Sequence, residues 1–204
     1  MGLGIAQDLQ NLKIDSIRSL LHAIDVDPEY LPSYSFLANL ASVSAETDTQ
    51  IRRRIAELAV AHPESPAAHY DYALALWKQR RVSPGSVSSA EIESQLRLAV
   101  AKDPKMARAH FQLGVFYAES GDYASATNEL RETVQLEPGN AEAHYRLAQA
   151  YRREKQPELA DVEIRKFEAT HANVAGEDSP DIQKLVPQLS QQMSKAAPCH
   201  EANH

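Results

Sequence analysis

Three histidines are the first residues of this sequence whose type and spacing suggest chemistry. His69, His110 and His144 each follow an alanine and precede an aromatic residue. Histidine is a common metal ligand, so the three could in principle bind one ion. However, packed helices lie roughly 10 Å apart, and imidazoles in register on successive helices cannot share an ion at about 2 Å. We therefore expect these histidines to pack within the fold.

Two further groups of residues invite a chemical interpretation. Cys199, His200 and His204 could bind a soft metal, but they lie in a polar tail with no further ligand at fixed spacing. The three arginines at 52–54 could bind phosphate, but they fall within an amphipathic helical pattern that places them on its solvated side. We expect neither group to form a site.

Motifs typical of enzymes are missing from the sequence. It contains no nucleophile elbow, no phosphate-cradling glycine loop, no His-Glu-x-x-His helix and no paired carboxylates. We therefore expect no catalytic residue, no cofactor and no metal, and we predict that this segment is not an enzyme.

Composition and charge narrow the classes further. The 204 residues are 43% hydrophobic, which is enough to bury a core, and the formal net charge is -7. Binding to nucleic acid requires an accumulated basic surface, so we expect no nucleic-acid partner. No apolar run approaches the roughly 20 residues that span a bilayer, and no secretory signal stands at Met1. The sequence therefore predicts a soluble protein without membrane insertion, and a cytoplasmic location is favoured over a periplasmic or secreted one.

The elements that position these residues are repeated. Three stretches begin almost identically, and each is expected to open a helix: Ala68–Ala73, Ala109–Gly114 and Ala143–Ala148. Prolines that end helical runs separate them at intervals of 35, 41 and 34 residues: Pro28, Pro63, Pro104 and Pro138. A fixed period of this length is typical of stacked helical repeats.

Residues 107–140 carry a family resemblance most fully. The matching positions are Leu113, Gly114, Tyr117, Gly121, Tyr123, Ala126, Leu130 and Pro138. The segment resembles the tetratricopeptide repeat, a helix-turn-helix unit of 34 residues. The resemblance implies an all-α fold, a right-handed α-solenoid of stacked antiparallel helix pairs that binds proteins or peptides.

The residues of this unit explain such a helix pair. Gly114 and Ala126 are small where two helix backbones must approach closely. Gly121 can adopt the left-handed conformation that ends a helix, and Pro138 blocks continuation. The same register predicts one column of small residues in the first helices and one of large apolar residues in the second helices: Gly4, Ala38, Ala73, Gly114 and Ala148; Leu20, Ile55, Leu96, Leu130 and Ile164.

This register divides the chain into repeats. The predicted units are residues 1–30, a truncated first repeat, then 31–65, 66–106, 107–140 and 141–173. The third unit carries a loop insertion at 82–87, after which the capping box Ser88-Ser-Ala-Glu91 restarts its second helix. We expect a linker and capping helix at 174–195 and a disordered tail at 196–204.

The N-terminus leaves two interpretations open. Leu3 and Gly4 already occupy columns that normally lie seven and eight residues into a repeat. Either Met1 opens a ragged first helix, or the chain is the C-terminal part of a longer repeat array, and the second is favoured. The chain could then be a module of a larger enzyme or signalling protein, or could form a homo-oligomer through its open N-terminal face.

The resemblance places a peptide-binding groove on the concave side, lined by the first helices. The predicted groove residues follow the histidine column and its successive turns: Ser35, Asn39, Tyr70, Asp71, Leu74, Lys78, Arg108, Phe111, Gln112, Val115, Glu119, Tyr145, Arg146, Gln149, Arg152 and Arg153. Tyr70, Phe111 and Tyr145 could anchor a partner, or they could be packing residues common in the family.

The charge of this face favours one class of partner. Lys78, Arg108, Arg146, Arg152 and Arg153 outnumber the acidic residues on it. We therefore expect an acidic peptide or a C-terminal carboxylate as the ligand. Asn39 and Arg108 alone resemble the residues by which some relatives hold a chaperone tail, so chaperone binding is not expected.

Overall fold

The computed structural model of the chain describes residues 2–27, 31–39 and 45–175, with side chains over 12–27, 32–38 and 48–171. These residues form nine α-helices and no strand. The helices are α1 (Gly2–Val26), α2 (Leu31–Asn39), α3 (Ala45–Ala61), α4 (Pro66–Val82), α5 (Ser89–Lys102), α6 (Ala107–Ser120), α7 (Tyr123–Leu136), α8 (Ala141–Arg153) and α9 (Pro157–Ala175). The predicted all-α class is confirmed.

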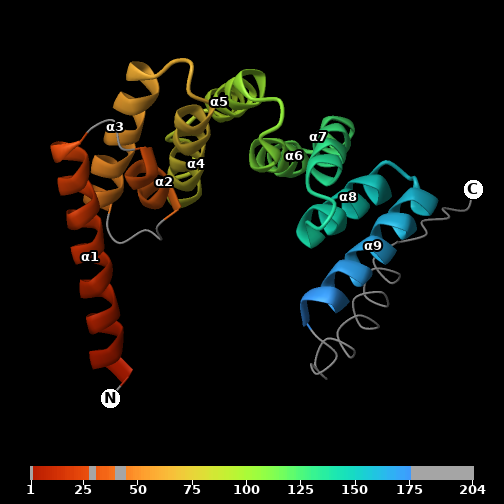
Figure 1. Cartoon of the computed structure of the whole chain (residues 1–204), viewed down its shortest axis with the longest axis horizontal. Helices are drawn as coiled ribbons and strands as arrows, with labels where there is room; N and C mark the ends of the chain where they lie inside the picture. The colour runs from red at the N-terminus through yellow and green to blue at the C-terminus, as the bar shows by residue number, and fades with distance from the viewer. Residues whose placement is uncertain (1, 28–30, 40–44, 176–204) are drawn as a thin grey trace, which may run out of the picture.

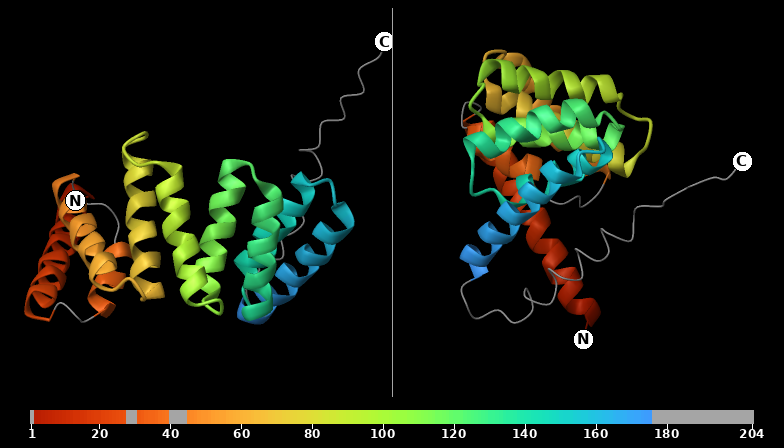
Figure 2. Two further views of the ribbon diagram at one scale, coloured as in Figure 1. Left: turned by 90° about the horizontal axis from the view of Figure 1, so that it is seen from above. Right: turned by 90° about the vertical axis from the view of Figure 1, so that its right-hand side faces the viewer.

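The helices stack as antiparallel pairs along an arch. In Figure 1, the first helices of the pairs, α2, α4, α6 and α8, line its inner side, and α3, α5 and α7 lie on its outer side. Figure 2 shows the helices side by side in one row, so each contacts mainly its neighbours along the chain. This is the architecture of an α-solenoid.

Side-chain caps explain where several helices begin and end. Ser65 accepts a hydrogen bond from the backbone N–H of Ala68 and stands directly before Pro66, which begins α4. Ser88 caps α5 at the predicted capping box by accepting from the N–H of Glu91. Gly121 ends α6 with φ 84°, in the left-handed region expected for it.

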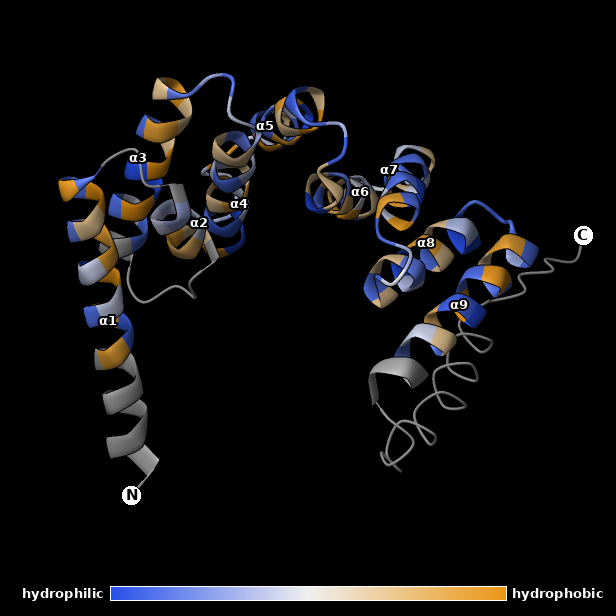
Figure 3. Cartoon of the chain, viewed as in Figure 1, coloured by the Kyte–Doolittle hydropathy of each residue, from blue (hydrophilic) through white to orange (hydrophobic). Residues whose placement is uncertain are grey.

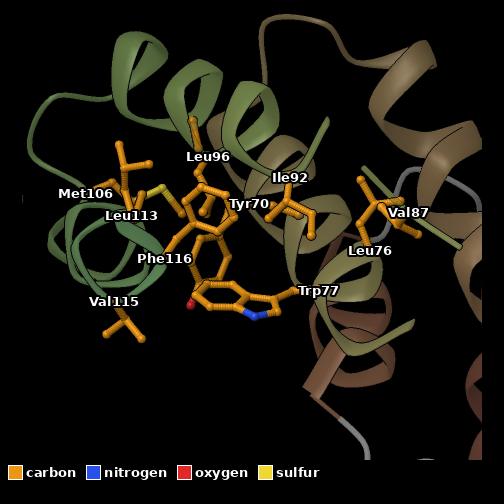
Figure 4. Packing of buried hydrophobic residues seen from close by; sticks show 13 residues of the cluster. Tyr70, Leu76, Trp77, Val87, Ile92, Leu96, Met106, Leu113, Val115 and Phe116 are labelled. Carbon is orange, nitrogen blue, oxygen red and sulfur yellow. The ribbon is translucent and has the colours of Figure 1, made fainter. Parts of the chain in front are cut away.

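Apolar and polar residues are interspersed along each helix (Figure 3), and buried apolar residues of neighbouring helices pack together as the core. One cluster joins α4, α5 and α6, and there the Trp77 ring meets the Phe116 ring edge-on at 5.5 Å between centroids (Figure 4). The large apolar column holds three fully buried residues, Ile55, Leu96 and Leu130. Because each such side chain removes its apolar surface from water, burial at this column is worth roughly 1.5–3 kcal/mol per residue.

The small column allows the helices of a pair to approach closely. Ala38, Ala73 and Ala148 are buried along it. A Cβ atom added at Gly114 would lie 2.7 Å from Cγ of Leu130 and 3.3 Å from the carbonyl oxygen of Ala126. The spacing of α6 and α7 therefore depends on glycine at this position.

The N-terminus differs from the sequence-based expectation. Residues 2–26 form the single helix α1, whereas Gly4 and Leu20 were expected on two helices of a truncated repeat. In the pair α6–α7 the chain reverses at Gly121 and Asp122, and Asp122 caps α7. The corresponding residues of the first unit are Asn11 and Leu12. Leucine cannot cap a helix and nothing there blocks continuation, so the helix runs on.

The boundaries of the remaining repeats stay a prediction. The residue range predicted for each of these repeats nevertheless contains a helix pair of the structure. The pairs α2–α3, α4–α5 and α6–α7 lie within residues 31–65, 66–106 and 107–140, and α9 extends two residues beyond 173. The predicted capping helix and tail, including Cys199, lie outside the described residues. Among the helices that the structure describes, none is both long enough and apolar enough to cross a membrane.

Candidate peptide-binding groove

The three histidines connect the two helices of a pair. Nδ1 of His144 lies 2.6 Å from a carboxylate oxygen of Glu163 on α9, and Nδ1 of His110 lies 2.7 Å from Glu129 on α7. Nδ1 of His69 lies 2.8 Å from the amide oxygen of Gln95 on α5. Each imidazole therefore bridges the first and second helices of its own unit.

The second nitrogen of each ring holds the turn that precedes the unit. Nε2 donates to the carbonyl oxygens of Pro63, Pro104 and Pro138 at 2.9, 3.1 and 3.0 Å from His69, His110 and His144 respectively. Both ring nitrogens are thus engaged by the protein. Within the described part of the chain, no group of three His, Cys, Asp or Glu side chains could hold a metal ion.

The predicted aromatic column is packed to different degrees. Tyr70 is 7% exposed, and Phe111 and Tyr145 are half-buried. Phe111 packs against the apolar clusters on both of its sides, and Tyr145 meets the Phe167 ring of α9 at 5.4 Å between centroids. Much of the aromatic area in this column therefore already contacts the fold.

Tyr70 lies beneath a cation from the next unit. The guanidinium carbon of Arg108 lies 4.9 Å from the centre of its ring, and Gln112 hydrogen-bonds its hydroxyl. Burial raises the pKa of the Tyr70 hydroxyl, and the charge of Arg108 partly offsets this rise. Three predicted groove residues, Tyr70, Arg108 and Gln112, thus form one cluster between α4 and α6.

Asp71 is a buried carboxyl group at the junction of α2 and α4. It is 1% exposed, and its Oδ2 accepts a hydrogen bond from the Ser35 hydroxyl at 2.6 Å. Its Oδ1 is buried without a hydrogen-bond partner. Burial raises the pKa of Asp71, and the Ser35 bond and the Arg108 charge reduce that rise. The sequence placed Ser35 and Asp71 on the groove, but not in contact with each other.

A larger cavity lies between α6, α7 and α8. Its volume is about 490 Å³. Six of the predicted groove residues line it, namely Val115, Glu119, Arg146, Gln149, Arg152 and Arg153. We name this cavity the arginine pocket. Ala118, Tyr123, Leu130 and Ala150 complete its lining and were not predicted.

The three arginines of this pocket are only loosely paired with carboxylates. Arg152 lies 3.6 Å from a carboxylate oxygen of Asp161, and Arg146 lies 3.4 Å from that of Glu142. Arg153 stands over the Tyr123 ring at 5.9 Å, and Nε of Arg146 is buried without a hydrogen-bond partner. Long ion pairs of this kind are weak, so the guanidinium groups retain capacity to bind an added anion.

The remaining predicted groove residues lie apart from this pocket. Lys78 lines a small cavity of about 100 Å³ between α2, α3 and α4, together with Asp48 and Arg52. Burial lowers the pKa of Lys78, and Asp48 partly offsets this. Leu74 packs into the core of the N-terminal half. Asn39 ends α2, and its side chain lies outside those that the structure describes.

A signal for the unpredicted lining was present in the sequence. Ala118 stands three residues after Val115 on the same face of α6, and Tyr123 is one of the positions that match the family pattern. The exposure of Tyr123 to the pocket, however, depends on the distance between α7 and α8. That distance follows from packing between units, which a single repeat does not encode.

The fold is shared with solved helical-repeat structures. The crystal structure of MamA is similar at a TM-score of 0.62 and 19% identity, over 82% of this chain and 95% of that one. TTC0263, described as a thermophilic TPR protein in Thermus thermophilus, is similar at 0.63 and 17% identity, over 92% and 95%. YrrB, described as a TPR protein with an unusual peptide-binding site, is similar at 0.56 and 18%, over 82% and 81%.

Sequence comparison identifies the repeats directly. No curated protein sequence matches the chain significantly. Two family models, both described as Tetratricopeptide repeat, match residues 93–130 and 117–185. Together with the shared solenoid fold, these matches show tetratricopeptide repeats over residues 93–185.

Proposed function

We propose that the chain is a scaffold that binds an acidic segment of a partner protein along the concave side of α4, α6 and α8. The observation that carries this proposal is the arginine pocket. Three guanidinium groups line one cavity with one carboxylate, Glu119, among them. A carboxylate that enters the pocket would gain charge-assisted hydrogen bonds, which are stronger than neutral ones.

The mixed charged and apolar lining of the pocket supports a peptide ligand. Val115, Ala118 and Ala150 supply apolar lining beside the arginines. An extended segment with alternating acidic and apolar side chains would therefore match both kinds of surface. YrrB, which shares the fold, is described as having a peptide-binding site. We accordingly assign this segment to binding rather than catalysis.

Fluorescence anisotropy with a labelled peptide tests the proposal. The probe is a fluorescein-labelled peptide of alternating glutamate and leucine with a free C-terminal carboxylate. We expect the double variant Arg152→Glu, Arg153→Glu to bind it at least about tenfold more weakly, which corresponds to about 1.4 kcal/mol. Raising the salt concentration should weaken binding to the wild type more than to the variant.

A matched control keeps the same change of net charge away from the groove. Arg18→Glu with Arg53→Glu alters two side chains that are 75% and 71% exposed on α1 and α3. This variant should bind as the wild type does. Equal losses in both variants, or no binding to the wild type, would contradict an acidic ligand in this pocket. An amidated probe separates recognition of the terminal carboxylate from recognition of glutamate side chains.

A further inference from the structure

One position of the first helices contacts the preceding first helix in two units, those of α4 and α6. It stands two residues before the small column and holds Phe36, Asp71, Gln112 and Arg146. Asp71 of α4 bonds Ser35 of α2, and Gln112 of α6 bonds Tyr70 of α4. Phe36 of α2 has no preceding first helix among the described residues, and it is 65% exposed.

The helix α1 is likewise less covered than its counterpart α7, which belongs to a complete helix pair. In α7, the second helix of a complete pair, Ala126, Leu130 and Thr133 are all 0% exposed. Their counterparts in α1, which stand at the same spacing, are more accessible. Ser16 is exposed, and Leu20 and Ala23 are only partly buried. We call the surface formed by Ser16, Leu20, Ala23 and Phe36 the N-terminal slot.

Residues 2–10 have the sequence of the helix that would fill this slot. Gly114 precedes Leu130 by 16 residues, and Gly4 precedes Leu20 by the same number. Since a Cβ at Gly114 would collide with Leu130, the partner of Leu20 must also be small at this point. The chain therefore carries both the slot and the segment that matches it.

The straight course of α1 separates the segment from its own slot. Sixteen residues of α-helix span about 24 Å at a rise of 1.5 Å per residue. Figure 1 shows the N-terminal part of α1 extending beyond the stack. Residues 2–10 consequently cannot contact Leu20 of the same chain while α1 is one helix.

A second copy of the chain resolves this mismatch. We infer that residues 2–10 of each copy occupy the N-terminal slot of the other, so that two α1 helices pack antiparallel. If Gly4 faces Leu20 of the partner copy, positions that sum to 24 are opposed, and Leu12 lies opposite Leu12 on the two-fold axis. Leu12 is 63% exposed in the single chain. Reciprocal exchange of an identical element is a common route to closed dimers.

This inference is independent of the proposed groove, and light scattering after size exclusion tests it. The wild type should elute at twice the mass of one chain, and Phe36→Asp and Leu12→Asp should each elute as monomers. Val60→Asp is the control, because Val60 is an 82% exposed apolar residue of α3 outside the slot. It should remain a dimer. A monomeric wild type overturns the inference. The acidic probe should bind the Phe36→Asp monomer normally, which separates the two proposals.

Cysteine cross-linking identifies the occupant of the slot. In a Cys199→Ser background, Gly4→Cys with Leu20→Cys should form a covalent dimer on mild oxidation, visible on a non-reducing gel. Gly4→Cys with Val60→Cys controls for random collision and should remain uncrosslinked. A disulfide within one chain would mean that residues 2–10 fold back onto their own slot. Either that result or an absence of cross-linking overturns exchange between copies.

Discussion

The pair α6–α7 and the helix α1 carry similar apolar spacing but fold differently. In both, a small residue precedes a leucine by 16 positions, as Gly114 precedes Leu130 and Gly4 precedes Leu20. Only the first is a helix pair. The difference lies in the turn, where Gly121 takes a left-handed conformation and Asp122 caps the next helix. The apolar stripe thus selects which faces are buried, and the turn residues decide whether the chain reverses.

Transplanting the turn should produce the largest effect. Asn11→Gly with Leu12→Asp gives α1 the two residues at which α6 ends and α7 begins. We expect α1 to divide and residues 2–10 to cover the chain's own slot, because glycine accepts the left-handed conformation and aspartate caps the following helix. The chain should be a monomer in light scattering, as Leu12→Asp alone should be, so the position of residues 2–10 distinguishes a divided α1 from a disrupted interface.

The cross-linking pair reads out this change directly. Added to the transplanted turn, Gly4→Cys with Leu20→Cys in a Cys199→Ser background should form its disulfide within one chain. Asn11→Ala with Leu12→Ala is the control, since alanine favours an uninterrupted helix. If the transplanted chain still forms interchain disulfides, the turn does not explain the difference between the two regions.

Truncating a core leucine to alanine should lower the free energy of unfolding by different amounts in the two regions. Leu130 is fully buried between α6 and α7, so Leu130→Ala should lower the free energy of unfolding by about 2–5 kcal/mol. Leu20 is only partly buried, and Leu20→Ala should cost about 1 kcal/mol. Urea unfolding in a Phe36→Asp background measures both without a contribution from self-association. Equal costs would mean that the slot is closed in the isolated chain.

A smaller effect is expected at Asp71, where the fold buries a charge instead of leaving a surface open. Because burial raises the pKa of Asp71 from its usual value of 3.8, the folded chain binds its proton more tightly than the unfolded chain does. Its contribution to stability is therefore full below the unfolded pKa and is lost as pH rises through the folded pKa. Asp71→Asn keeps an acceptor for Ser35 and removes the charge.

Thermal unfolding at two pH values checks this expectation. Relative to the wild type, Asp71→Asn should melt higher at pH 7, and its advantage should shrink at about pH 4. Asp15→Asn is the control, because the Asp15 side chain is 68% exposed on α1. If the Asp71→Asn variant is less stable at pH 7 than at pH 4, relative to the wild type, the sign is reversed and the burial argument is contradicted.

The sequence predicts most of the fold because its signals are local and repeated. Proline spacing, the small residue at Gly114 and the Ser88 cap each determine a feature within one unit, and the structure contains all three. The continuous course of α1 was missed because a repeat register was extended to residues whose turn chemistry differs. Register alone does not reverse a chain.

The candidate site was less predictable because its contacts join different units. The repeat register predicts Arg152 and Arg153 on the inner face, and in the structure both line the arginine pocket between α6, α7 and α8. It did not reveal that Asp71 is buried against Ser35 or that Arg108 covers the Tyr70 ring. Such contacts depend on the rotation between successive helix pairs, which arises from the whole stack.

The histidine hydrogen bonds make each turn depend on the repeat that follows it and not on the repeat that precedes it. His144 holds the carbonyl of Pro138, and His110 that of Pro104, so every such turn is ordered by the unit that follows it. Melting of the last helix pair would release the linker behind it and loosen the end of the preceding pair. Opening that begins at the C-terminal end should thus spread toward the N-terminus in steps, whereas opening at α1 releases no histidine-bound turn downstream. Amide protection against exchange would fall off asymmetrically along the array.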